Sequence, residues 1–314
     1  MDDLCQELTA GRPDRPVAVT FGVYDGVHQG HRHVLATLRK AAKARGFTSV
    51  VVTLSNHPLS VLRPEIPVVL LTSLRERIAL LESEGVERVI PVTFTLEMSR
   101  FTPERFMREL CDCLGVRHFV VGPDFALGRD REGTLSVLEA IGFEMGYTVE
   151  VASHFDLDGV SVHSSAIRET LANGDLPSVE RFLGRRFSVD GPVVEGEGRG
   201  GGLLGFPTAN IGLGPLQALP EDGIYATWAT IDGKRYGSAT SVGIKPTFHD
   251  AAPRVVEAFI LDFDGDLYRQ HIRLEFVERL RGQEKYDTVD ELVEQIVRDV
   301  KQARTVLSAD QKET

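Results

Sequence analysis

Long apolar runs, positive charge and cysteine are all scarce in this chain. None of its segments reaches about 18 consecutive apolar residues, so the sequence predicts no membrane span. Its net charge of −11 at pH 7 argues against a nucleic-acid partner, which normally requires a basic face, but allows single nucleotides as ligands. Residues 1–16 are polar and contain no apolar core of a signal peptide, so we expect a cytoplasmic protein.

The three cysteines are too few for a disulfide framework. Cys111 and Cys113 lie two residues apart in a stretch with a helical pattern, where they would point to different sides and make a poor metal pair. With Cys5 as the only other thiol, we expect buried thiols that have no special role.

Residues 17–184 alternate between apolar strand patterns and helical patterns. Helices are indicated at residues 31–44, closed by Gly46 as a cap, after a capping box at residues 73–76, and from Thr102-Pro103 onward. This α/β alternation predicts a doubly wound, Rossmann-like parallel sheet, which binds ligands beyond the carboxyl ends of its strands. The predicted strands are residues 17–22, 49–54, 86–92, 118–122 and 148–152.

From about Phe187 onward, short strand patterns follow one another with turn signals between them. A capping box at residues 288–291 opens a last helix, whose apolar stripe would pack against a barrel or sheet. We therefore predict a small antiparallel β-barrel with a C-terminal helix, and domains of residues 1–184 and 185–314. The predicted strands are residues 187–194, 223–231, 236–244, 255–261 and 272–280, and the stripe is Val289, Leu292, Val293, Ile296, Val297 and Val300.

Two histidines follow the first predicted strand, in the His-x-Gly-His motif of residues 28–31. His28 and His31 would face the same way at a helix N-terminus, which adds N–H donors and a positive dipole end that suit a phosphate. Gly22 and Gly30 allow a close backbone approach. Imidazoles in this place can donate hydrogen bonds to a transferring phosphate and its leaving group. The alternative is that the motif arises by chance in a loop.

A glycine-rich segment begins the second half. Residues 196–201 match the G-x-G-x-x-G dinucleotide fingerprint, but they lie among strands and precede no helix, so the required structural context is missing. We predict instead a flap in which Gly198, Arg199 and Gly200 close over phosphates.

The next segment, Pro-Thr-Ala-Asn at residues 207–210, offers two neutral oxygen donors. If the chain is extended there, Thr208 and Asn210 project to one face, and their oxygens suit a hard cation such as Mg²⁺. The acidic turn at residues 262–265 lacks the later ligands of a calcium loop, so we expect an ordinary strand turn.

The first half resembles the nucleotidylyltransferase module of the bacterial bifunctional riboflavin kinase/FMN adenylyltransferases. The matching motifs are GVYDGVHQGH (22–31), VVGPDFALGRDREG (120–133) and HSSAIR (163–168), with Asn-His-Pro at residues 56–58 where the family has Pro-His-Pro. The resemblance implies that His28 and His31 contact the ATP phosphates. It further implies ATP-binding roles for Gly22, Asp25, Gly30, Ser164, Ser165 and Arg168, and places His57 and Asp124 beside the flavin and nucleotide pockets.

The second half is similar to the kinase module of the same family. The matching motifs are GFPTAN (205–210), SVGIKPTF (241–248), VVEAFILDFDGDLY (255–268) and LRGQEKYDTVDEL (280–292). The resemblance implies that Thr208 and Asn210 bind Mg²⁺ and ATP, and that Glu257 is the general base that activates the riboflavin 5′-hydroxyl. Judged without the resemblance, Glu257 could equally point to solvent from the alternate face of its strand.

The resemblance as a whole implies a transferase that phosphorylates riboflavin to FMN in the barrel and adenylylates FMN to FAD in the N-terminal domain. ATP would be the co-substrate and Mg²⁺ the metal, with no nucleic-acid or membrane partner. One alternative is an enzyme in which only the kinase is active, and the intact His28, His31 and Arg168 argue against it. The other is a flavin-storage protein, which would need neither a general base nor a metal ligand. The departures from the family pattern are Tyr24, Leu54, Asn56, His163 and Gln283.

Overall fold

The computed structural model describes residues 3–195, 206–214, 216–244 and 254–313. The chain divides into two compact units. The first, here called the N-terminal unit, comprises residues 1–68 and 74–164. The second, the C-terminal unit, comprises residues 69–73 and 165–314. No helix in the described part of the chain is long and apolar enough to cross a membrane.

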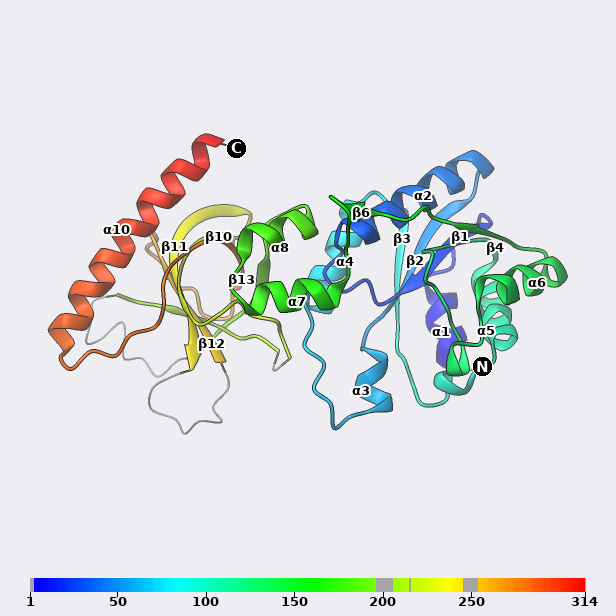
Figure 1. Ribbon diagram of the computed structural model, residues 1–314, viewed down its shortest axis with the longest axis horizontal. Helices are drawn as coiled ribbons and strands as arrows, with labels where there is room; N and C mark the ends of the chain where they lie inside the picture. The colour runs from blue at the N-terminus through cyan, green and yellow to red at the C-terminus, as the bar shows by residue number, and fades with distance from the viewer. Residues whose placement is uncertain (1–2, 196–205, 215, 245–253, 314) are drawn as a thin grey trace. The chain divides into compact units, whose positions relative to one another are not determined.

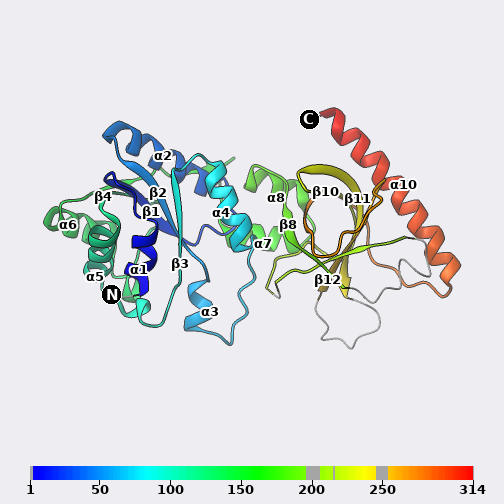
Figure 2. The same cartoon turned by 180° about the vertical axis from the view of Figure 1, so that it is seen from behind.

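The N-terminal unit is built on a five-stranded parallel sheet with strand order β3-β2-β1-β4-β5 (Figure 1; Figure 2). All five strands expected from the sequence are present, which confirms the doubly wound prediction. The sheet order runs one way from β1 to β2 and β3, and the other way from β1 to β4 and β5, so β1 and β4 flank the point at which it reverses. The strands are β1 (Val17–Gly22), β2 (Thr48–Leu54), β3 (Arg88–Val92), β4 (Val116–Val121) and β5 (Thr148–Val151).

Helices cover both faces of this sheet because consecutive strand residues are apolar and buried, so that neither face is left to solvent. Val17 and Val19 of β1 pack into a core with α1, α5 and α6, whereas Ala18 packs into a second core with α2 and α4. The helices and short elements are α1 (Asp3–Ala10), α2 (Gln29–Arg45), α3 (Pro58–Leu62), α4 (Leu74–Ser83), η1 (Met98–Arg100), α5 (Pro103–Glu109), the π-helix η2 (Leu110–Leu114), η3 (Arg129–Arg131), α6 (Leu135–Met145), β6 (Asp156–Leu157) and β7 (Val160–Ser161).

Three of the helix caps expected from the sequence are present. Gly46 ends α2 in the left-handed conformation with φ of 68°. The hydroxyl of Thr102 accepts a hydrogen bond from the Arg105 N–H, with Pro103 in the first helical turn. In the C-terminal unit, Thr288 and Glu291 form the reciprocal capping box, each side chain accepting from the other's backbone N–H. Local chemistry therefore determines these helix ends.

The C-terminal unit contains a closed antiparallel barrel with strand order β10-β11-β12-β9-β8-β13. Five of these strands were expected, and the sixth is the short β9, which the sequence indicated only as an extended segment. The elements are α7 (Ser164–Ala172), α8 (Leu176–Leu183), β8 (Ser188–Val194), β9 (Ala209–Ile211), β10 (Gly223–Ile231), β11 (Lys234–Ile244), β12 (Arg254–Ile260), β13 (His271–Arg281) and α10 (Val289–Glu313).

Helix α10, red in Figure 1, packs on the barrel through its second half. Ala303 and Leu307 are buried there against Trp228 and Leu261. The predicted apolar stripe was therefore partly wrong: Val300 joins the contact, but Val289 and Val297 are 57% and 52% exposed. Positions 300, 303 and 307 follow the helical repeat on one side, and Val297 lies one residue off that line.

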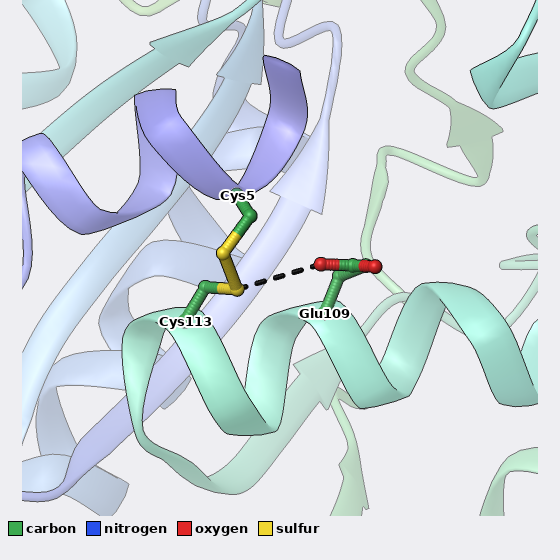
Figure 3. A group of neighbouring side chains, drawn as sticks. All are labelled: Cys5, Glu109 and Cys113. Atoms are coloured by element: carbon green, nitrogen blue, oxygen red, sulfur yellow. Dashed lines mark hydrogen bonds between the residues drawn. A yellow bond between two sulfur atoms is a disulfide. The ribbon is translucent and has the colours of Figure 1, made fainter. Parts of the chain in front are cut away.

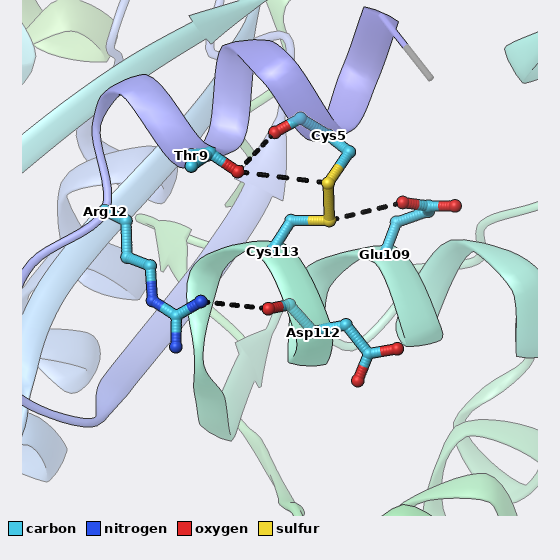
Figure 4. Close-up of a disulfide and its surroundings, with 6 residues drawn as sticks. All are labelled: Cys5, Thr9, Arg12, Glu109, Asp112 and Cys113. Carbon is cyan, nitrogen blue, oxygen red and sulfur yellow. Dashed lines mark hydrogen bonds between the residues drawn. A yellow bond between two sulfur atoms is a disulfide. The ribbon is translucent and has the colours of Figure 1, made fainter. Parts of the chain in front are cut away.

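The expectation of buried or idle thiols was also wrong for Cys5 and Cys113. Cys5 and Cys113, which are 108 residues apart, form a disulfide between α1 and η2 (Figure 4). Cys111 is the free thiol. Sequence spacing did not indicate this pair, because only the packing of α1 beside η2 brings the two sulfur atoms together.

Candidate active sites

A cleft of about 360 Å³ opens beyond the carboxyl ends of β1 and β4 in the N-terminal unit. It therefore lies where the strand order reverses, the usual ligand position of an open α/β sheet. Six of the residues expected in the adenylyltransferase site line it: Gly22, His28, Gly30, His31, Asp124 and Ser164.

His28 and His31 are stacked, with ring centroids 3.6 Å apart and an interplanar angle of 20°. His28 is the N-cap of α2, and its Nδ1 accepts a hydrogen bond of 3.3 Å from the His31 N–H. Because Nδ1 acts as an acceptor, the ring proton of neutral His28 is on Nε2. The pair thus presents imidazole at a helix N-terminus whose first turn, residues 29–32, has no acidic side chain.

The turn that carries His28 is conformationally strained. Tyr24 and Val27 both have positive φ, 54° and 40°, a backbone conformation that residues other than glycine rarely adopt. Tyr24 is buried, and its hydroxyl and the Thr20 hydroxyl are hydrogen-bonded at 2.6 Å. Burial raises the pKa of Tyr24 well above its usual value, so the phenol stays protonated. Ser164, the first residue of α7, contacts the turn by donating a 2.9 Å hydrogen bond to the Asp25 carbonyl.

Arg77 of α4 supports the same turn from inside the protein. Its side chain is almost fully buried, and it donates two 2.8 Å hydrogen bonds, from Nη1 to the Val23 carbonyl and from Nη2 to the Leu54 carbonyl. The Thr53 hydroxyl donates a second bond, of 3.1 Å, to the Val23 carbonyl. Burial lowers the pKa of Arg77, and the Asp25 carboxylate opposes this effect. Sequence analysis missed Arg77, since an arginine in an amphipathic helix normally reaches solvent.

Other predicted residues of this site are not part of the cleft lining. His57 caps α3, accepting from the Leu59 N–H, and is outside the cleft lining. Ser165 and Arg168 follow Ser164 in α7 but belong to the C-terminal unit. The cleft also includes His33, whose Nε2 is 2.8 Å from the Ser153 hydroxyl. Sequence analysis had no motif by which to find that contact.

Three of the departures from the family pattern have structural partners. Asn56 forms reciprocal side-chain hydrogen bonds with the backbone of Phe94, at 3.0 and 2.8 Å, which join the ends of β2 and β3. His163 lines the cleft and lies 2.9 Å from the Ser161 hydroxyl. Gln283 packs so closely over Gly243 that a Cβ there would lie 2.2 Å from its side chain.

The residues expected in the kinase site meet on the barrel wall. Glu257 of β12 is directly opposite Asn210 of β9 in the antiparallel register, and Thr208 immediately precedes β9. Opposed residues of antiparallel strands project to the same face, with Cβ atoms about 5 Å apart. Glu257 and Asn210 are half-buried on the face opposite to buried Val256 and Ala258. Glu257 therefore does lie on the face of β12 that alternates with the buried one, and on that face it is beside Asn210.

Two of these residues offer neutral oxygen atoms. The hydroxyl of Thr208 and the amide oxygen of Asn210 are the neutral, hard ligands that suit Mg²⁺. The predicted flap residues Gly198, Arg199 and Gly200 lie outside the described residues.

Known proteins match both units. The family model described as FAD synthetase matches residues 11–166, and the one described as riboflavin kinase matches residues 183–307. The bifunctional riboflavin kinase/FMN adenylyltransferase of Pseudomonas fluorescens is 36% identical over 297 residues, covering 94% of each chain. The Bacillus subtilis protein of that name is 34% identical, covering 91% of this chain and 90% of its own.

A solved structure is also similar over almost the whole chain. It has a TM-score of 0.83 and 27% sequence identity, covers 95% of this chain and 96% of its own, and is titled a macrolide-efflux protein from Streptococcus pneumoniae. The sequence relatives and the two family models agree with each other and with the two-unit fold. On these matches, the chain belongs to the family of bifunctional riboflavin kinase/FMN adenylyltransferases, with an FAD synthetase part followed by a riboflavin kinase part.

Proposed function

We propose that the N-terminal cleft transfers the adenylyl group of ATP to FMN, and the observation that carries the proposal is the stacked His28–His31 pair at the start of α2. A phosphate oxygen of FMN attacks the α-phosphorus of ATP, and pyrophosphate leaves. Negative charge gathers on the transferring phosphate and on the leaving group. We assign its stabilisation to the two imidazoles and to the N–H groups in the first turn of α2.

The remaining residues of this site position the substrates. Gly22 and Gly30 allow the phosphates to approach the backbone; at Gly30, a Cβ would come within 3.2 Å of the His28 ring. We assign contacts with the triphosphate to Ser164, Ser165 and Arg168. Asp25 shapes the turn, and we assign Asp124 and His57 to the flavin and nucleotide pockets.

The adenylyltransferase assignment is tested with His28→Ala. FAD formation from FMN and ATP should fall by about 10²- to 10³-fold, the usual loss for one charge-stabilising donor. FMN formation from riboflavin by the same preparation should stay near wild type and serves as the folding control. Equal loss of both activities in a folded variant would contradict a separate site.

In the barrel, we propose that Glu257 is the general base of riboflavin phosphorylation. The ribityl 5′-hydroxyl is a weak nucleophile at neutral pH. A carboxylate held beside it can accept its proton as the bond to the γ-phosphorus of ATP forms, and ADP leaves. The cross-strand pairing of Glu257 with Asn210 supports this role, because it brings the base next to a group suited to hold the nucleotide.

We assign Mg²⁺ binding to Thr208 and Asn210. The bound ion would neutralise charge on the ATP phosphates. The predicted flap of Gly198, Arg199 and Gly200 would cover those phosphates with backbone N–H groups and one guanidinium.

The kinase assignment is tested with Glu257→Gln, which retains the shape of the side chain but removes its basicity. Turnover of riboflavin should fall by about 10²- to 10⁴-fold, while riboflavin and ATP-Mg²⁺ still bind by calorimetry and added FMN is still converted to FAD. Glu278→Gln, on the exposed surface of β13, is the matched control and should leave both activities unchanged. If Glu257→Gln retains more than about a third of the turnover, Glu257 is not the base.

The same two assays, applied to the wild-type protein, also separate the rival functions. A protein with only kinase activity would make no FAD even as wild type, and a flavin-storage protein would turn over neither substrate. We propose residues 1–184 and 185–314 as the two catalytic domains, and the cytoplasm, where ATP is available, as the place of both reactions.

A further inference from the structure

Three side chains at the junction of α1 with the α5–η2 helical run form a cluster that neither proposed reaction uses. Cys5 comes from α1, and Glu109 and Cys113 come from the neighbouring run (Figure 3). Their ligand atoms all lie within 4.8 Å of one another. One Glu109 carboxylate oxygen is 3.4 Å from the sulfur of Cys113.

The cysteines differ in access. Cys113 is buried, Cys5 is half-buried, and Cys111 is half-buried but outside the pair. Burial raises the pKa of Cys111 to about 11, so this thiol is unreactive at neutral pH. Cys5 is therefore the sulfur that a small reagent meets first.

Contacts that do not involve sulfur hold α1 in place. Leu4 and Leu8 are buried in the core. The carboxylate of Glu7 accepts hydrogen bonds from the backbone N–H and the hydroxyl of Thr93, at 2.9 and 2.8 Å. Arg12 donates to the Asp112 carbonyl at 3.0 Å, beside the disulfide (Figure 4). The reduced protein therefore keeps Cys5 next to Cys113, which favours closure of a disulfide within the chain over a reaction with a second molecule.

We propose that Cys5 and Cys113 form a reversible oxidation site that low-molecular-weight disulfides such as oxidised glutathione close, and that closure stabilises the N-terminal unit. The Cys5 thiolate attacks one sulfur of oxidised glutathione, whose S–S bond breaks, and one glutathione leaves and takes up a proton. The Cys113 thiolate then attacks the Cys5 sulfur, and the second glutathione leaves as a thiol. The protein loses two electrons and two protons, and oxidised glutathione gains both.

Closure constrains a long loop. Residues 5–113 include β1, β2 and β3, together with the His28–His31 turn. Linking them restricts the unfolded chain, and the stabilisation grows with loop length. The barrel lies outside this loop and gains nothing from it.

The test uses the full-length protein equilibrated at several ratios of reduced to oxidised glutathione. Alkylation of the unfolded protein followed by mass spectrometry should find three reactive thiols after reduction and one, Cys111, after oxidation. Oxidation should raise the melting temperature of the N-terminal unit, followed by circular dichroism, by about 5–15 °C. The fluorescence of Trp228, the single tryptophan, reports on the barrel, and its transition should not move.

Variants separate the pair from its neighbour. Cys5→Ser and Cys113→Ser should each abolish the oxidation-dependent shift, whereas Cys111→Ser, the matched control, should retain it.

Three results would overturn the proposal. One is that the wild-type protein does not form the Cys5–Cys113 disulfide even with excess oxidised glutathione. Another is an unchanged melting temperature in the linked protein. The third is one zinc ion per chain in the reduced wild type, absent from Cys5→Ser, since Zn²⁺ held by Cys5, Glu109 and Cys113 would make this a metal site.

Discussion

Arg77→Met tests whether the buried guanidinium positions the catalytic turn. The substitution removes both hydrogen bonds of Arg77, those to the Val23 and Leu54 carbonyls, while filling a similar apolar volume. The Val23 carbonyl keeps only the Thr53 hydroxyl as a side-chain partner among these contacts. The residues that follow Val23 are strained, with positive φ at Tyr24 and Val27, so the turn depends on such bonds to keep its shape.

The expected magnitude follows from these contacts. Hydrogen bonds to a charged donor are worth about 1.5–3 kcal/mol each, but burying the guanidinium costs several kcal/mol in lost hydration. We therefore expect the N-terminal unit to lose about 2 kcal/mol of unfolding free energy, or about 4–8 °C in melting temperature. If the productive shape of the turn is disfavoured by about 1.4 kcal/mol, the kcat of FAD formation falls about tenfold.

The assay compares FAD formation from FMN with FMN formation from riboflavin, both measured well below the melting temperature of the variant. Arg77→Lys should be intermediate in kcat, because an ammonium group is a compact donor that cannot reproduce the two-pronged contact. Thr53→Val removes the other side-chain donor to the Val23 carbonyl, and its effect should be non-additive with that of Arg77→Met. An Arg77→Met protein that melts earlier yet makes FAD at the wild-type kcat would refute the positioning role.

Three further predictions concern stability. Burial, and after it the nearby positive charge of Arg45, lowers the pKa of His118 below 6.5. The unfolded chain therefore binds a proton at this histidine at a higher pH than the folded chain does, and the N-terminal unit should lose stability as pH falls through about 6.5. His118→Gln should flatten that part of a plot of melting temperature against pH. Asp310 is buried and accepts hydrogen bonds of 2.9 Å from Arg186 Nη1 and 2.7 Å from the Trp228 indole. Asp310→Asn removes the charge that faces Arg186, so it should destabilise the barrel by about 3 kcal/mol in a fluorescence-detected urea titration; an unchanged midpoint would show that the Arg186–Asp310 ion pair contributes nothing. Two fragments, residues 185–314 and residues 165–314, should both make FMN. The shorter one should be less stable, because it lacks the buried faces of α7 and α8. If the shorter fragment folds but makes no FMN, the proposed domain boundary at residue 185 is wrong.

Local patterns in the sequence were sufficient for much of this protein. Strand β1 and the His28–His31 motif were predicted in the correct order, as were the Gly46 cap and the Thr288 capping box. Each depends on interactions within a few residues, or on the short apolar run that is typical of a strand buried on both faces. The family motifs then identified both reactions, because each motif is a short run of contiguous residues that can be recognised in the sequence alone.

Tertiary structure alone decided which distant residues meet. Cys5 joins Cys113 across 108 residues, Asn210 pairs with Glu257, and Arg77 turns inward to two strand ends. No local propensity encodes such contacts, since the same cysteine, asparagine or arginine is equally compatible with a solvent-exposed position in its helix or strand. Their partners are determined by strand register and helix packing. Register and packing are set by the burial of the whole hydrophobic core, so they are properties of the complete fold.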